Sequence, residues 1–189
     1  MKSKHIYIFT GIGFFLFLIL IASCNKMPKN QEELMGYINN PKENLCFTET
    51  YEAFQLKVTY WPKQLLNLPS LSANKEAEMI LYFRFDITMN DERTSNIALY
   101  NNLKKELSLN LNKIISLQQC NTDCDLFSSS FMPFYGHLPT DVLLVSFKVN
   151  KGCSNNYELN FNGQVFNVEN STFTFSENKI KFLNKLNYE

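Results

Sequence analysis

The stretch EMILYFRFDITM, residues 78–89, alternates apolar and polar side chains over most of its length. The apolar positions recur every second residue, at Met79, Leu81, Phe83, Phe85 and Ile87. Successive side chains of an extended chain point to opposite faces, so this period predicts a β-strand with one buried face and one polar face. It is the clearest strand of the sequence, and strands of this kind are typical of antiparallel sheets.

Further segments favour extended structure on both sides of this strand. They are residues 54–60, 113–118, 142–149 (VLLVSFKV) and a final run through Phe173 and Phe175. Alternation or a short apolar run bounded by turn residues predicts a strand in each case. The chain therefore has enough strands for a sheet or a sandwich.

The dipeptide Asn162-Gly163 separates two β-type runs, residues 157–161 and 164–168. An Asn-Gly pair between such runs is the strongest short-range signal for a hairpin, so we expect these two runs to pair. Residues 179–186 fit either a helix or a strand.

Leucines recur every fourth residue from Leu99 to Leu111, with charged residues between them. This spacing predicts an amphipathic helix over residues 95–112. A shorter helix is expected over residues 31–39, which begin with acidic residues and end before a proline. The predicted fold class is α+β: a mostly antiparallel sheet or sandwich with one packed amphipathic helix and a short N-terminal helix.

Residues 128–139, SSSFMPFYGHLP, are predicted to form a loop rich in large side chains. These are Phe131, Met132, Phe134, Tyr135 and His137. Aromatic residues and methionine are enriched in interface cores, which makes this segment a candidate partner-binding loop. The alternative is that these side chains close the end of the core, because large exposed apolar patches are rare on soluble proteins.

The N-terminus has the layout of a secretory signal, in which Lys2 and Lys4 precede an almost wholly apolar run from Ile6 to Ala22. The run is short for a bilayer span, which needs about 20 apolar residues, although an uncleaved membrane anchor is an alternative. The four residues from Ile21 to Cys24, IASC, resemble the lipobox of bacterial lipoproteins. The resemblance implies cleavage before Cys24 and acyl chains on its sulfur and its new amino group.

The same resemblance implies a location in the bacterial cell envelope. Asn25 stands where some lipoproteins carry an Asp that retains them in the inner membrane, so the outer membrane is favoured. The remaining chain loosely resembles small uncharacterised lipoproteins of Bacteroidota-type bacteria, a likeness that carries no functional residue beyond Cys24.

On this interpretation residues 1–23 are a signal peptide, residues 24–30 a tether, and residues 31–189 a single globular domain. Removing Lys2 and Lys4 from 18 basic and 18 acidic residues leaves 16 against 18, a net charge of −2. Such a balance argues against a nucleic-acid partner.

Four cysteines remain after Cys24: Cys46, Cys120, Cys124 and Cys153. An even number in an exported domain predicts two disulfides, with three pairings open. One alternative is a zinc site formed by Cys120, Cys124, Cys153 and His137. Another is that the cysteines are free, buried thiols. The only other histidine, His5, lies in the signal, and no recognised catalytic or cofactor motif is present, so we expect no metal and no cofactor.

The leading hypothesis is a lipid-anchored envelope protein that is not an enzyme and that binds or scaffolds another envelope protein. One alternative is a periplasmic hydrolase of cell-wall or glycan substrates with paired carboxylates, which would need both groups in one cleft. Another is a carrier of an apolar ligand, which would need an internal pocket.

Overall fold

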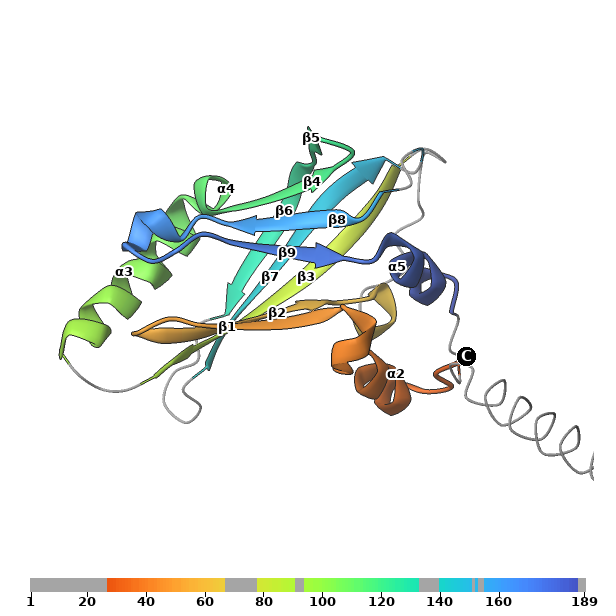
Figure 1. The fold of residues 1–189 in the computed structure, drawn as a ribbon, viewed down its shortest axis with the longest axis horizontal. Coiled ribbons are helices and arrows are strands. Elements are labelled where there is room, and N and C mark those ends of the chain that lie inside the picture. The colour runs from red at the N-terminus through yellow and green to blue at the C-terminus, as the bar shows by residue number, and fades with distance from the viewer. Residues whose placement is uncertain are drawn as a thin grey trace, which may run out of the picture.

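The computed structural model describes residues 27–66, 78–90, 94–132, 140–150, 152 and 155–186. Its nine described strands form two antiparallel sheets packed face to face (Figure 1). Sheet A has the order β1 (Cys46–Thr50), β2 (Phe54–Tyr60), β3 (Glu78–Met89), β7 (Thr140–Asn150), β6 (Asp125–Met132). Sheet B has the order β5 (Thr122–Asp123), β4 (Ile115–Gln119), β8 (Tyr157–Phe161), β9 (Ser171–Phe175). The predicted α+β class with a mostly antiparallel sheet is confirmed.

The strand predicted for residues 78–89 is β3, and it lies at the centre of sheet A. It pairs with β2 on one side and β7 on the other, and Phe83 lies opposite Tyr60 and Val145. Its buried side chains are Leu81, Phe83, Phe85 and Ile87. The alternation that identified this strand therefore coincides with its inward face.

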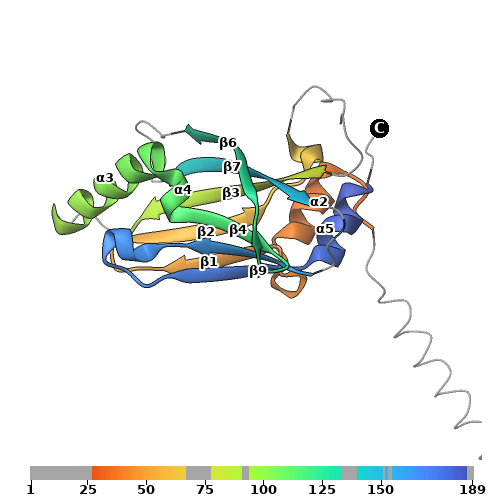
Figure 2. The same ribbon diagram turned by 90° about the horizontal axis from the view of Figure 1, so that it is seen from above.

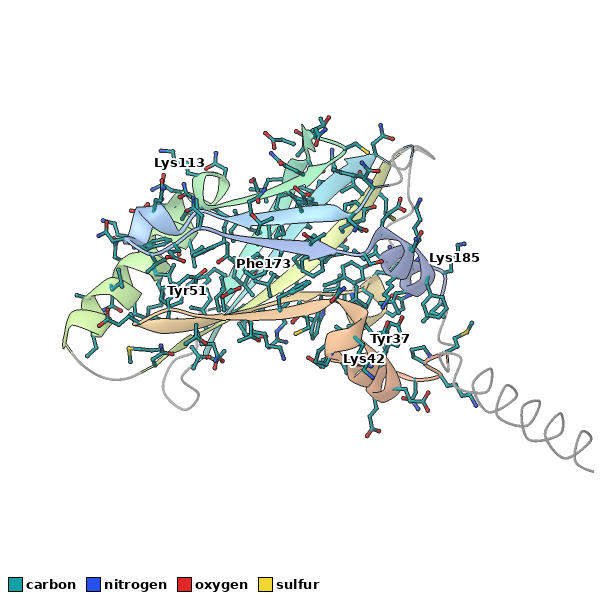
Figure 3. The ribbon with its side chains drawn as sticks, in the orientation of Figure 1. Tyr37, Lys42, Tyr51, Lys113, Phe173 and Lys185 are labelled. Atoms are coloured by element: carbon teal, nitrogen blue, oxygen red, sulfur yellow. The ribbon has the colours of Figure 1, made fainter. Side chains whose placement is uncertain are left out.

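Aromatic rings fill the space between the two sheets. Phe175 of β9 lies 4.9 Å from Phe47 of β1 and 5.0 Å from Phe83 of β3, measured between ring centroids. Phe173, in the middle of the molecule in Figure 3, is 5.8 Å from Phe47. Edge-to-face and tilted contacts of this kind add to the hydrophobic gain of burying the rings.

The long helix packs at one end of the sandwich. It comprises α3 (Thr94–Leu109) and the single turn α4 (Leu111–Ile114), separated at Asn110, and β4 follows directly. Tyr100, Leu103 and Leu107 are buried, as the leucine spacing predicts. The predicted helix and following strand are confirmed, with a break inside the helix that the sequence did not indicate.

Two short helices and two 3-10 turns pack together at the opposite end (Figure 2). They are α2 (Gln31–Ile38), η1 (Pro41–Glu43), η2 (Lys63–Leu65) and α5 (Glu177–Asn184). Tyr37 of α2 contacts Phe182 of α5, and Gln64 donates hydrogen bonds to the carbonyls of Leu183 and Leu186. Both ends of the described chain thus meet here, and α5 resolves the ambiguous segment as a helix.

The hairpin predicted around Asn162-Gly163 is wrong. Asn162 has φ −82°, and the following residues form the 3-10 helix η3 (Gly163–Phe166) instead of a strand. Phe166 is buried and stacks on Phe161, and β8 pairs with β9. Burial of this ring decides the local structure. Gly163 is required for another reason, because a Cβ there would lie 2.1 Å from a backbone oxygen of Glu169.

Within the described residues, no helix is both long enough and apolar enough to cross a membrane.

Candidate functional site: the edge strand β6

Part of the segment predicted as a loop is strand β6, which forms one edge of sheet A. Its residues from Asp125 to Met132 pair with β7, and within the described part of the chain β6 has no other strand neighbour. The prediction of a loop is therefore wrong for Ser128 to Met132. Three consecutive serines favour a turn-rich segment, but in the structure each of them is paired with a residue of β7.

The described side chains of β6 are mostly exposed, including apolar ones. The exposed fractions of Leu126, Phe127 and Met132 are 38%, 46% and 50%. Phe131 is partly buried and packs against the core. Of the five residues predicted for partner binding, the structure thus exposes Met132 and places Phe131 on the core, while Phe134, Tyr135 and His137 lie outside the described residues.

A β-bulge shapes this edge at Phe127. The pairing with β7 shifts between Leu126 and Ser128, so one extra residue stands on β6. The Lys148 ammonium lies 5.3 Å from the centre of the Phe127 ring, a distance at which the ring face attracts a cation. Beyond the bulge, the hydroxyls of Ser128 and Ser146 are hydrogen-bonded at 2.7 Å. The bulge and this bond hold Phe127 outward while the strand stays attached to the sheet.

The other edge strands of the two sheets are shorter than β6, and β1 and β9 have five residues each. Strand β5 has only two residues. Strands β1 and β9 close one side together, because Phe47 packs on Phe173 and Phe175 and the hydroxyls of Tyr51 and Ser171 are hydrogen-bonded at 2.8 Å. An edge strand presents unpaired N–H and C=O groups to any added strand, and β6 combines such an edge with exposed apolar side chains.

Among the described residues, three carboxylates are buried, and each pairs with its own lysine. Lys179 binds Glu43, Lys181 binds Glu177, and Lys104 lies 3.8 Å from Asp141, which also accepts a hydrogen bond from the Tyr100 hydroxyl. The exposed fractions of the Glu43, Glu177 and Asp141 side chains are 7%, 4% and 5%, respectively. Lys104 and Asp141 join α3 to β7, Lys179 and Glu43 join α5 to η1, and Lys181 and Glu177 pair within α5, so the three pairs are separate sites.

Two open hollows lie on the outer face of sheet B. One, of about 330 Å³, is lined by Lys113, Asn160 and Thr172 among others; the second, of about 390 Å³, is lined by Gln118, Asn156 and Glu158 among others. Amides and hydroxyls make up most of both linings, and the only carboxylate among the lining residues is that of Glu158. Neither hollow holds the pair of carboxylates that glycoside hydrolysis needs.

The cysteines do not form the two predicted disulfides. Cys46 and Cys124 are free thiols, which corrects the prediction for both. Cys120 is disulfide-bonded. Burial, followed by the charges of Asp123 and Asp125, raises the pKa of the Cys124 thiol to about 11. The described residues contain no cluster of ligands that could hold a metal ion.

Cys24 and Cys153 lie outside the described residues, so neither the acylation site nor a zinc site that includes Cys153 has a described geometry.

No protein-family model, no curated protein and no solved structure matches this chain. The functional argument therefore rests on the residues and contacts themselves.

Proposed function

We propose that the protein is a lipid-anchored cell-envelope lipoprotein that is not an enzyme and that binds another envelope protein at the β6 edge. The observation that carries the proposal is the eight-residue edge strand with Leu126, Phe127 and Met132 exposed. An extended segment of a partner can add to such an edge, its main chain supplying hydrogen bonds and its side chains covering the apolar groups.

The anchor in this proposal is Cys24. Its support is the sequence Ile21-Ala22-Ser23-Cys24 behind a charged and apolar leader. A single acyl chain binds a membrane weakly, whereas several chains hold a protein firmly, since each buried methylene adds about 0.8 kcal/mol. Asn25 favours the outer membrane by resemblance.

The described geometry favours a binding protein over a hydrolase. A glycoside hydrolase places two carboxyl groups about 5–9.5 Å apart on either side of the scissile bond. Here the buried carboxylates of Glu43, Asp141 and Glu177 each face a lysine, and the two hollows on sheet B offer one carboxylate, that of Glu158.

The packing of the sandwich is the argument against an apolar-ligand carrier. A carrier needs space between the sheets, whereas here rings from both sheets meet directly, as in the contact of Phe83 with Phe175 at 5.0 Å. Close-packed aromatic side chains occupy the volume that an apolar ligand would need.

The partner proposal is tested by cross-linked capture from envelope membranes with the lipidated full-length protein. The double variant Phe127→Glu/Met132→Glu places charges on the edge and should reduce the captured partner at least about tenfold, the usual effect of removing an interface hot spot. The control Leu109→Glu/Val165→Glu alters two apolar residues that are 70% and 39% exposed elsewhere, and should capture as the wild type does.

Two further measurements complete the test. Backbone amides on the outer edge of β6 should exchange rapidly in the isolated protein and slowly in the captured complex. Strong protection of the outer-edge amides of β6 in the isolated protein, or equal loss of capture in both double variants, would contradict partner binding at this edge. Acylation is tested separately, by the mass of the N-terminal peptide and by Cys24→Ala.

A further inference from the structure

One end of the molecule presents an excess of exposed lysines. This lysine end consists of α2, η1, η2 and α5 with their flanking residues. Its exposed lysines are Lys29, Lys42, Lys63 and Lys185. In the described part of the chain, none of the four forms an ion pair with a carboxylate.

The acidic residues of the lysine end do not cancel this excess of positive charge. Lys179 and Lys181 neutralise the buried Glu43 and Glu177. The exposed acidic residues on these elements are Glu32 and Glu33. Four exposed lysines and two exposed glutamates give this end an excess charge of +2. The whole chain after residue 23 has a net charge of −2, so the positive charge is concentrated at this end.

The proposed anchor enters the molecule at the same end. Pro28 is buried, the Lys29 amide donates to the Glu33 carboxylate, and Asn30 caps α2, so the chain is fixed to the lysine end from these residues onward. Cys24 precedes Met27 by three residues, which span at most about 11 Å at roughly 3.6 Å per residue. A membrane that holds Cys24 is therefore close to this end.

We infer that the lysine end docks on an anionic phospholipid surface, with Lys29, Lys42, Lys63 and Lys185 facing the headgroups. The inference rests on the proposed acylation of Cys24. Lysines close to an anionic leaflet are attracted to it, and the attraction decays within a Debye length of about 8 Å at physiological salt. The link from Cys24 to Met27, at most about 11 Å, is comparable with this range and holds the lysine end close to the membrane surface.

Docking of this kind fixes the orientation of the sandwich. Helix α3 and Lys113 lie at the end opposite α2 and α5 (Figures 1 and 3), so they point away from the membrane. The long axis of the molecule then stands away from the bilayer, and the β6 edge lies along its side, where a partner can approach.

The chain contains a probe for this arrangement. Trp61 is the only tryptophan, and it lies two residues before Lys63 of the lysine end. Full-length lipidated protein is reconstituted in phosphatidylcholine vesicles with or without phosphatidylglycerol, each carrying a nitroxide on a fraction of the headgroups. Quenching of Trp61 fluorescence should be stronger with phosphatidylglycerol and should fall when salt is added.

A matched pair of double variants tests the residues. Lys42→Glu/Lys185→Glu should lower the ratio of docked to undocked protein at least about tenfold in anionic vesicles, given the usual attraction per lysine. Lys105→Glu/Lys113→Glu reverses two exposed lysines near the opposite end and should leave quenching at the wild-type level. Trp61 and Lys63 are unchanged in both variants.

The outcomes separate the docking from the anchor. Equal quenching in neutral and anionic vesicles, or equal effects of the two double variants, would overturn the docking while vesicle flotation still reports the anchor. Absence of an acyl mass on Cys24, with loss of flotation, would overturn the anchor and the docking that depends on it.

Discussion

Lys179 of α5 forms an ion pair with Glu43 of η1, 136 residues earlier in the chain, and so joins the two ends of the domain. The Glu43 side chain is 7% exposed, and Lys179 also donates to the carbonyl of Lys42. Tyr37 supplies a further hydrogen bond to the same carboxylate. A buried carboxylate needs such partners, because removing one leaves a charge that neither water nor protein compensates.

The first prediction concerns acid. Burial raises the pKa of the Glu43 carboxyl, but the hydrogen bonds from Lys179 and Tyr37 and the Lys179 charge outweigh it, so its pKa lies below 4.5. The unfolded chain binds more protons between the two pKa values, so this stabilisation is complete above pH 4.5 and is lost as the pH falls through the folded pKa. Urea unfolding from neutral pH downward should show a steeper acid loss for the wild type than for Glu43→Gln; equal slopes would contradict the assignment.

The second prediction concerns the same pair at neutral pH. Lys179→Met should lower the free energy of unfolding by about 2 kcal/mol, because Glu43 keeps its burial and loses its cation. Lys113→Met alters an exposed lysine near the other end and should be nearly neutral. Chemical denaturation of both variants checks this, and a small effect at Lys179 would show that water replaces the ammonium.

The third prediction concerns the contact between β2 and α5. The fully buried Tyr60 hydroxyl donates a 2.8 Å hydrogen bond to the Asn184 side-chain oxygen. Tyr60→Phe removes the hydroxyl donor and leaves the Asn184 side-chain oxygen without this hydrogen bond. The free energy of unfolding should fall by about 1–2 kcal/mol. Hydrogen exchange should localise the change to faster opening of α5, whereas uniform loss across the domain would argue for a general packing defect.

The fourth prediction concerns the aromatic core. Phe83 contacts Phe147 and Phe175, so Phe83→Ala opens a cavity between the sheets and should cost about 3–5 kcal/mol. Leu109→Ala shortens a side chain that is 70% exposed and should change stability by less than about 0.5 kcal/mol. Thermal and urea unfolding of both variants give the comparison; similar losses would mean that the core relaxes around the missing ring.

The fifth prediction concerns the thiols. Cys124, with a pKa near 11 against an ordinary 9.0, should be alkylated about 100-fold more slowly than an ordinary thiol near pH 8, because the thiolate is the reactive form. Alkylation of the unfolded protein is the control. Unfolding should bring the alkylation rate of Cys124 to that of an ordinary thiol. Peptide mapping of the same samples should find Cys120 bonded to Cys153 if Cys24 is acylated, and recovery of a free Cys120 would contradict the disulfide.

Much of the fold follows from local patterns. The two-residue alternation around Phe83 and the four-residue spacing of leucines around Leu103 each mark a single buried face. Such a face can be recognised in the sequence without knowing which element packs against it. The Asn162-Gly163 signal failed because it is equally local. Packing of Phe166 against Phe161, with the chain passing close over Gly163, outweighed the turn preference.

The candidate site was predictable only in part. Phe131 and Met132 were predicted as binding residues because they are large side chains between turn-forming residues. The serines before them favoured a loop, so the strand was not predicted. The sequence around Leu126 and Phe127 did not predict their exposure, because that exposure depends on β6 being an edge strand that pairs with β7. Sheet order is a long-range property that alternation along one segment does not contain.

The sequence by itself determined the α+β class, the position of β3, and the expectation that Cys24 is an attachment site, because periodicity and the leader are read from neighbouring residues. Tertiary structure decided that β6 is an exposed edge, that Cys46 and Cys124 are free, and that lysines from α2, η1, η2 and α5 share one end. The lysine end brings together residues more than a hundred positions apart. Their proximity comes from the burial of the aromatic core, which brings both ends of the described chain to the same end of the sandwich.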